Sequence, residues 1–324
     1  MKKFILAVSI LFSFQSILWA QQDPQFTQFF LNKLNYNPGY AGTEEKICAM
    51  TAYRTQWLGF GNSKAGLSPT TFVGSINGPI GKNLGLGLNI YNDQLGFEKS
   101  LIPTISISYR MHFSNGGILS PGIGIGFVQK TLAGDKLKPL DLGDSKIPNV
   151  PVSGNTKDID FGLYYSQPTL GILDNFYASV SSTHITKGQI LYSWGNGQYQ
   201  HTMAEHYYIM TGAEYRISNT LAIDPNLFVK TDMAKWSTDI NVMAVYNNKF
   251  KGGLTYRTSN EIALLLGFKF SDDMQLGYSY DLTLNTLRSY NDGSHEIVFK
   301  YCFMPKMKPK PEKIPIPRLT PRFL

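Results

Sequence analysis

The segment EIALLLGFKFSDDMQLGYSYDLTLNTLRSYNDGSHEIVFKYCF (residues 261–303) contains three runs in which apolar side chains occupy every second position. In the first run Ile262, Leu264 and Leu266 share one face, and Gly267 and Lys269 lie on the other. A period of two is the period of a β-strand. Because the second face mixes charged residues and glycine, the runs are typical of a transmembrane β-barrel, whose strands are apolar toward lipid and polar toward the lumen. The alternative is a soluble β-sandwich with these polar faces on its outer surface.

The same alternation, followed along the chain, predicts fourteen strands and a regular pattern of connections. The connections at 81–83, 114–116, 217–220, 247–249 and 272–273 are short, whereas those at 57–69, 129–158, 183–203 and 281–293 are long. Short turns on one side and long loops on the other are the outer-membrane arrangement, with the long loops extracellular. We therefore predict an all-β, transmembrane antiparallel β-barrel of about 14 strands with both termini in the periplasm. The predicted strands are 47–56, 70–80, 84–92, 99–113, 117–128, 159–166, 175–182, 204–216, 221–231, 236–246, 250–258, 261–271, 274–280 and 294–303.

The N-terminus indicates export from the cytoplasm. Lys2 and Lys3 precede an apolar run that ends at the small residue Ala20, which predicts a signal peptide over residues 1–20. Residues 21–46 form an N-terminal pre-barrel segment, rich in aromatics, that we expect to fold as a plug in the lumen or along the rim; a disordered leader is the alternative. The barrel spans 47–303, in the outer membrane of a Gram-negative bacterium and in contact with its lipid.

A proline-rich basic tail, residues 304–324, is expected to extend into the periplasm as a solvated chain or as a ligand for a periplasmic partner. The formal net charge of the chain is +7. Signal peptide and tail account for all of it, so the barrel is formally neutral and no nucleic-acid partner is predicted.

Five glycines on the lumenal faces of two predicted strands, 84–92 and 117–128, form a distinct group. Glycine weakens a strand interior unless another piece of backbone approaches closely or the sheet must bend. The group therefore predicts either a plug packed against this wall or a local bend of the sheet. Its members are Gly85, Gly87, Gly122, Gly124 and Gly126.

A search for reactive groups identifies no catalytic residue, no cofactor site and no metal site. His201 and His206 lie in and just after a long loop, but their spacing matches no metal motif. His295 has no visible partners for a lipase-like triad. We therefore expect a protein that is not an enzyme and that needs no cofactor.

The two cysteines, Cys48 and Cys302, lie near the periplasmic ends of the first and last strands, which pair when the barrel closes. Both are predicted to face the lumen at the same height, which makes a disulfide possible in an oxidising compartment. Two buried free thiols are the alternative.

Several short motifs are spread along the chain. They are Asp23-Pro24, Asn37-Pro38-Gly39-Tyr40-Ala41-Gly42, Tyr53-Arg54-x-Gln56-Trp57, the glycine-leucine run at 85–88, and Gly277-Tyr278-Ser279-Tyr280-Asp281 with Gly293-Ser294-His295-Glu296. Together they resemble the PorP/SprF family of type IX secretion outer-membrane proteins. The resemblance covers essentially the whole barrel; the proline-rich tail departs from it. It implies a partner: a large secreted surface protein, such as a gliding-motility adhesin, which the barrel helps to export or anchor through its C-terminal domain. Other type IX or periplasmic components are implied as further partners, through the tail.

Two functions therefore remain open at this point. The first is secretion and surface attachment of a protein client, in which Trp194 and Tyr199 of the long loop 183–203 are the expected anchors, because aromatic residues dominate interface energetics. The second is a diffusion channel or small-molecule transporter of the outer membrane.

Overall fold

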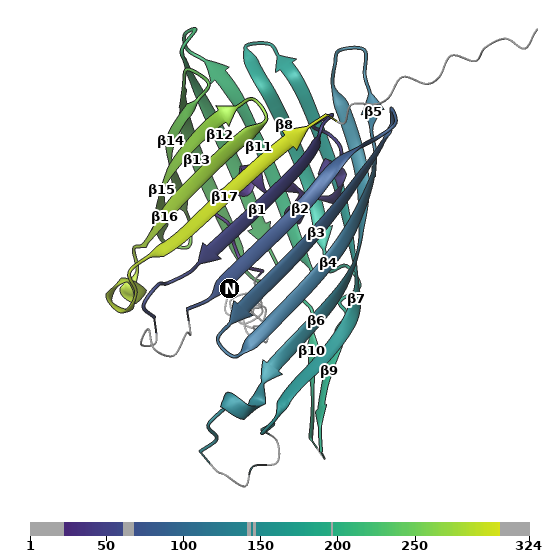
Figure 1. Cartoon of the computed structure of the whole chain (residues 1–324), viewed down its shortest axis with the longest axis vertical. Coiled ribbons are helices and arrows are strands. Elements are labelled where there is room, and N and C mark those ends of the chain that lie inside the picture. The colour runs from purple at the N-terminus through teal and green to yellow at the C-terminus, as the bar shows by residue number, and fades with distance from the viewer. Residues whose placement is uncertain (1–22, 61–67, 141–143, 145–146, 196, 305–324) are drawn as a thin grey trace, which may run out of the picture.

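The chain folds as a closed antiparallel β-barrel of fourteen strands (Figure 1). The computed structural model describes residues 23–60, 68–140, 144, 147–195 and 197–304, and the predicted signal peptide and most of the tail lie outside these ranges. The ring closes because β1 pairs with β17 and β4 pairs with β6. The wall strands are β1 (Ile47–Thr55), β2 (Thr70–Ile80), β3 (Leu84–Leu95), β4 (Glu98–Tyr109) with its short continuation β5 (Met111–His112), β6 (Ile118–Ala133), β7 (Pro151–Leu170), β8 (Leu173–Thr183), β11 (His206–Arg216), β12 (Leu221–Thr231), β13 (Trp236–Tyr246), β14 (Phe250–Arg257), β15 (Glu261–Ser271), β16 (Met274–Thr283) and β17 (Ser294–Phe303).

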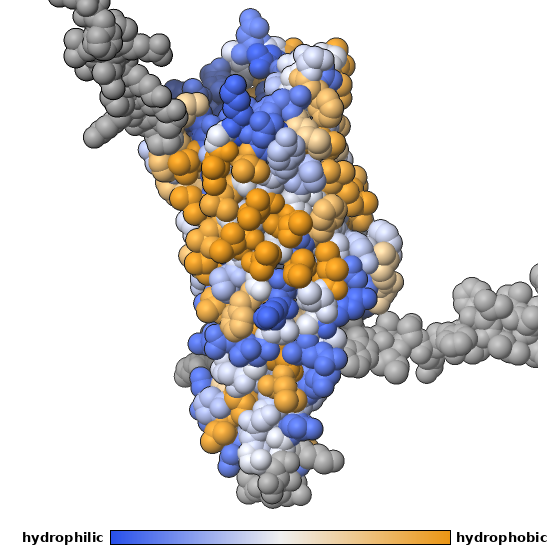
Figure 2. All heavy atoms as spheres, turned by 90° about the vertical axis from the view of Figure 1, so that its right-hand side faces the viewer, coloured by the Kyte–Doolittle hydropathy of each residue, from blue (hydrophilic) through white to orange (hydrophobic). Residues whose placement is uncertain are grey.

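The predicted facing of the strands is confirmed. In β4, Ile105 and Ile107 point outward and are half exposed, whereas Thr104, Ser106 and Ser108 are buried in the lumen. Figure 2 shows the outward side chains gathered into a hydrophobic band across the visible face, with hydrophilic residues above and below it. This band is the surface that a bilayer covers in an outer-membrane barrel. Within the described residues, no helix is long and apolar enough to cross a membrane.

The two ends of the barrel differ, as the connection lengths predicted. We call the end with the short connections the turn end and the opposite end the loop end. Residues 129–158 and 183–203, predicted as loops, are instead partly strand. β6 and β7 continue as one paired ladder as far as Ala133 and Pro151. The segment after β8 contains a separate hairpin, β9 (Gln189–Trp194) and β10 (Gly197–Thr202). Together they project beyond the rest of the loop end, at the bottom of Figure 1.

The pre-barrel segment is a plug inside the lumen. It contains three short helical turns, η1 (Phe29–Leu31), α2 (Lys33–Tyr36) and η2 (Pro38–Tyr40). Phe26, Phe29 and Tyr36 are almost fully buried and pack with Tyr208 and Phe228 of the wall. The two rings of Phe29 and Phe228 are stacked with centroids 5.0 Å apart. The aromatic residues of this segment and the lumenal side chains of the wall therefore form one buried cluster inside the barrel.

The lumenal glycines make room for this plug at three of the five predicted positions. A Cβ atom at Gly85 would lie 2.0 Å from the carbonyl oxygen of Ala41, and one at Gly122 would lie 2.5 Å from the backbone nitrogen of Gly39. Gly87 faces Leu34 of the plug. Gly124 and Gly126 instead face side chains of the wall itself, so the plug does not explain them.

The strand register at the closure seam places Cys48 directly opposite Cys302. The two sulfur atoms are placed for a disulfide between residues that are 254 positions apart in the sequence. Both residues are buried on the lumenal side of the seam beside Glu44 of the plug. Opposed positions on paired antiparallel strands bring two cysteines close without any rearrangement of the backbone.

We therefore predict that the mature protein carries this bond. Alkylation of the unfolded protein is expected to label neither cysteine without reductant and both after reduction, as counted by intact mass. A Cys48→Ser variant, in which Cys302 has lost its partner, serves as the control and should take up one label under both conditions. Two labels on the unsubstituted chain without reductant would show that the thiols are free.

Candidate functional site

The lumen contains a buried network of charged side chains beside the plug. Arg54 of β1 donates to Asp281 over 2.6 Å and to Glu296 over 3.1 Å. Arg257 of β14 binds Asp239 at 3.0 Å and also pairs with Glu261. The network includes four carboxylates and two guanidinium groups, and Arg54, Asp239, Asp281 and Glu296 are each at most 1 % exposed. Such charges are tolerated away from water because each is paired and hydrogen-bonded.

The plug is fastened to the wall through this network. The backbone N–H groups of Thr27 and Gln28 donate to the two carboxylate oxygens of Glu296 over 2.7 and 2.9 Å. The Thr27 hydroxyl donates to Asp281 over 2.6 Å, and the Gln25 amide donates to Asp239 over 2.7 Å. Hydrogen bonds to charged acceptors are stronger than neutral ones. The network therefore holds the first turn of the plug in place. Among the described residues, Gln28 of the plug is the donor to Glu296 Oε1, whereas the other three oxygens also accept from Arg54 or Arg257.

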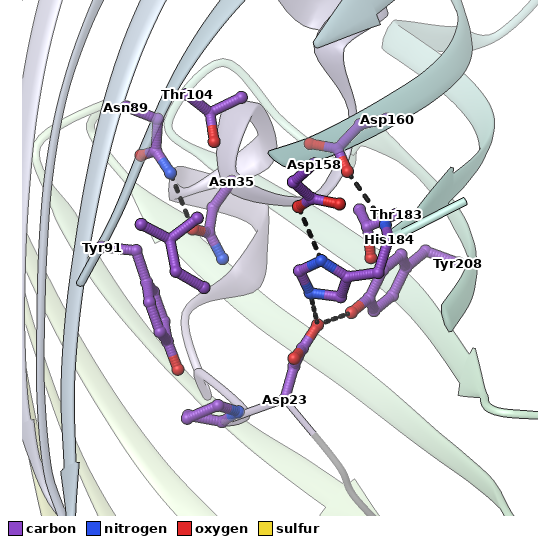
Figure 3. A pocket seen from close by; sticks show the side chains of 12 residues that line it. Asp23, Asn35, Asn89, Tyr91, Thr104, Asp158, Asp160, Thr183, His184 and Tyr208 are labelled. Atoms are coloured by element: carbon purple, nitrogen blue, oxygen red, sulfur yellow. Dashed lines mark hydrogen bonds and ion pairs between the residues drawn. The ribbon is translucent and has the colours of Figure 1, made fainter. Parts of the chain in front are cut away.

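A second polar cluster lies where the plug begins, toward the loop end. His184, the residue that follows β8, lies between two carboxylates (Figure 3): its Nδ1 is 2.6 Å from Asp158 and its Nε2 is 3.4 Å from Asp23. Burial disfavours charge on the imidazole, but the negative charge of Asp23 and the hydrogen bond to Asp158 outweigh it and raise the pKa of His184 well above its usual value. His206 at the start of β11 completes the cluster, with its Nδ1 3.6 Å from the same Asp23 oxygen.

Three sets of side chains in the described residues have the composition and spacing of a metal site. They are Asp23 with His184 and His206, Asp158 with Asp160 and His184, and Glu44 with Cys48 and Cys302. The third set is not available to a metal when its two sulfur atoms are joined to one another. The first two share His184 and overlap. Sequence spacing did not find them, because His184 and His206 are 22 residues apart and Asp23 lies in another segment.

An apolar groove occupies the projecting part of the loop end. It has a volume of about 710 Å³ and lies between the segment after β6 and the β9–β10 hairpin. Tyr199 is 56 % exposed and stacks on the buried ring of Tyr192, with centroids 6.2 Å apart. Trp194 is half buried and covers Gly197, whose Cβ position would touch the indole. The groove is lined by Leu132, Leu137, Lys138, Pro139, Ile147, Pro148, Tyr192, Trp194, Gly197, Gln198 and Tyr199.

The two predicted anchor residues, Trp194 and Tyr199, are thus brought together on one surface. The sequence analysis placed them in the same loop but missed the residues that face them, including Leu137 and Pro148. Those residues come from the connection between β6 and β7, about fifty positions earlier in the chain. Their proximity follows from the three-dimensional packing of the two projections and has no local sequence signal.

A family model described as "Type IX secretion system membrane protein PorP/SprF" matches residues 18–301 of the chain. The chain belongs to this family. The match covers the plug and nearly the whole barrel and confirms the resemblance carried by the sequence motifs. Family and fold together point to the outer membrane, and the family is that of a membrane protein of a secretion system.

Comparison with solved structures finds outer-membrane barrels. The toluene transporter TbuX of Ralstonia pickettii superposes with a TM-score of 0.52 at 11% identity, covering 85% of this chain and 93% of the transporter. The toluene transporter TodX of Pseudomonas putida gives a TM-score of 0.48 at 9% identity, covering 83% and 92% of the respective chains. A FadL homologue of Pseudomonas aeruginosa gives 0.45 at 10% identity, covering 82% and 91%. At this level of identity the likeness to TbuX supports the fold alone. No curated protein matches the sequence.

Proposed function

We propose that this PorP/SprF protein holds a large type IX client at the cell surface, and that the apolar groove at the loop end is the surface that the client contacts. The observation that carries the proposal is the grouping of Trp194, Tyr192 and Tyr199 with apolar residues of a second projection in one exposed groove. Exposed apolar surface of this kind is typical of interaction sites. In this arrangement both termini lie on the periplasmic side, the loop end faces outward, and the client is bound through its C-terminal domain.

The filled lumen supports a holding role over an open pore. Residues Phe26, Phe29, Tyr36 and Tyr40 of the plug are each at most 4 % exposed, and the charge network fastens the segment to β13 and β17 of the wall. Conduction through such a lumen requires the plug to move or leave. The channel or transporter remains the competing function, and it predicts measurable conductance or solute uptake by the unsubstituted protein.

The groove predicts a defined loss of binding. A Trp194→Ala/Tyr199→Ala double variant is expected to weaken client binding at least tenfold. Truncating an aromatic anchor that a partner covers on binding commonly costs about 2 kcal/mol or more, and 1.4 kcal/mol corresponds to a factor of ten. The client is first identified by mass spectrometry after purification of the native protein in mild detergent. Binding of its purified C-terminal domain is then measured by surface plasmon resonance.

The matched control is Tyr290→Ala, since Tyr290 is 70 % exposed in η5 (Thr286–Tyr290), at the same end of the barrel but outside the groove. The control should bind like the unsubstituted protein. Equal binding by the double variant would remove the groove from the proposal. Conductance in planar bilayers without any bound surface protein would favour the channel.

A further inference from the structure

We propose that Asp23, His184 and His206 form a binding site for a divalent transition-metal ion such as Zn²⁺, which ties the start of the plug to the barrel wall. Imidazole nitrogen and carboxylate oxygen are the ligands of such ions, and zinc sites with three protein ligands leave a fourth position open. Each of the three residues comes from a different part of the fold. Asp23 begins the plug, His184 follows β8, and His206 begins β11.

The distances between the ligand atoms match a single small ion. Zinc lies about 2.0–2.1 Å from nitrogen and oxygen ligands, so two ligands of a tetrahedral ion are about 3.3 Å apart. The Asp23 Oδ2 atom lies 3.4 Å from His184 Nε2 and 3.6 Å from His206 Nδ1. All three ligand atoms fall within 4.8 Å of one another. An ion at their centre would require the His206 ring to give up two contacts, that of Nδ1 with the carbonyl oxygen of Ala204 at 3.0 Å and that of Nε2 with the backbone N–H of Asp23 at 3.4 Å.

His184 is hydrogen-bonded to a carboxylate, the kind of partner that metal-bound histidines commonly have. Its other ring nitrogen, Nδ1, lies 2.6 Å from the carboxylate of Asp158, which is 3 % exposed. A carboxylate in this place fixes the ring orientation and leaves the lone pair of Nε2 directed at the metal. The backbone N–H of His184 also donates to Asp160 over 3.1 Å, so that the residue is held at both ends. Figure 3 shows the imidazole between Asp158 and Asp23.

The surroundings provide a second, independent indication. The cluster borders a small cavity of about 40 Å³, enough for an ion-bound water. Asn89 and Tyr91 of β3 line this cavity and are more than nine-tenths buried, yet Asn89 Oδ1 and the Tyr91 hydroxyl meet no hydrogen-bond partner among the described residues. Buried polar atoms without partners are uncommon in native proteins. A water in this cavity is a group that either atom can bind.

The electrostatic balance also favours a cation. Asp23, Asp158 and Asp160 bring three carboxylates to the cluster, and the nearby ammonium of Lys230 binds the backbone oxygen of Asp23 at 2.8 Å. Set against the one ammonium of Lys230, the three carboxylates leave an excess of acidic groups whose charge a bound cation offsets.

The test is titration of the full-length protein with ZnCl₂. The protein carries a tag without histidine, is purified in detergent and is stripped with a chelator, and binding is followed by competition with a zinc-sensitive dye. One ion per chain is expected. His184→Gln and His206→Gln should each reduce affinity more than about 100-fold, and Asp158→Asn, which removes the positioning carboxylate, by about 10–100-fold. His201→Gln, a buried histidine of β10 outside the set, is the control and should bind like the unsubstituted protein.

A second measurement does not depend on variants that fail to fold. X-ray absorption of the zinc-loaded, unsubstituted protein should show about four nitrogen and oxygen ligands, two of them imidazoles. Less than one tenth of an ion per chain, an all-oxygen shell, or full affinity in either histidine variant would overturn the proposal. Binding of Ca²⁺ with no binding of Zn²⁺ would overturn it as well.

Discussion

Replacing Arg54 with methionine is expected to lower the free energy of unfolding by about 3–5 kcal/mol, the usual cost of removing one partner from a buried ion pair. Arg54 is 1 % exposed and is the donor that lies between Asp281 and Glu296. Without Arg54, the carboxylates of Asp281 and Glu296 stay buried but lose its positive charge and its hydrogen bonds. The loss should appear as a lower urea midpoint of unfolding in detergent. Unfolding is measured by the shift between the folded and unfolded bands on a gel.

Two further variants separate this effect from a general loss of charge. Arg54→Lys keeps the positive charge but loses the planar guanidinium that reaches both carboxylates. Its urea midpoint should therefore lie between those of Arg54→Met and the unsubstituted protein. Arg216→Met removes an exposed guanidinium, 61 % accessible, that is 3.4 Å from Asp174, and should leave the midpoint unchanged. If Arg54→Met unfolds at the same midpoint as Arg216→Met, the network is not a major source of stability.

Replacing Gly85 and Gly122 together with alanine is expected to weaken the docking of the plug while the barrel remains folded. A Cβ at Gly122 meets the backbone of Pro38 and Gly39 at 2.5–2.6 Å, and one at Gly85 meets Ala41. These contacts are with backbone atoms, which cannot rotate away as a flexible side chain can. Overpacking typically costs about 1–3 kcal/mol per site, and here it acts against the docked plug rather than against the strands.

The consequence is measurable as ion conductance in planar bilayers and as protease cleavage within residues 23–46. The double variant should conduct and should be cleaved, whereas the unsubstituted protein should do neither. Gly252→Ala in β14 is the matched control, because no atom lies within 4 Å of its Cβ position. A double variant that conducts no more than the control would mean that the plug stays docked and that the wall yields instead.

The alternation of side chains in segments such as 261–271 was enough to predict the barrel. Each residue of a barrel strand faces either lipid or the lumen, and its polarity follows from that position alone. β15, at Glu261–Ser271, was predicted with the same limits, and all fourteen wall strands were found. The opposition of Cys48 and Cys302 could also be predicted, since closure of an antiparallel ring sets the register of its first and last strands. The family followed from short motifs in the plug and at the seam.

Other features depended on tertiary structure. The ladder of β6 and β7 beyond Gln129 was predicted as a loop, because strands that leave the membrane lose the apolar alternation that marks them. The docking of the plug depends on hydrogen bonds such as that from Thr27 to Glu296, which joins residues 269 positions apart. The cluster of Asp23, His184 and His206 and the groove at Trp194 likewise assemble from distant segments. The alternation of side chains indicates which face of a strand each residue occupies. Contacts across the lumen depend instead on the closed barrel and on the path of the plug, so no local sequence pattern predicts them.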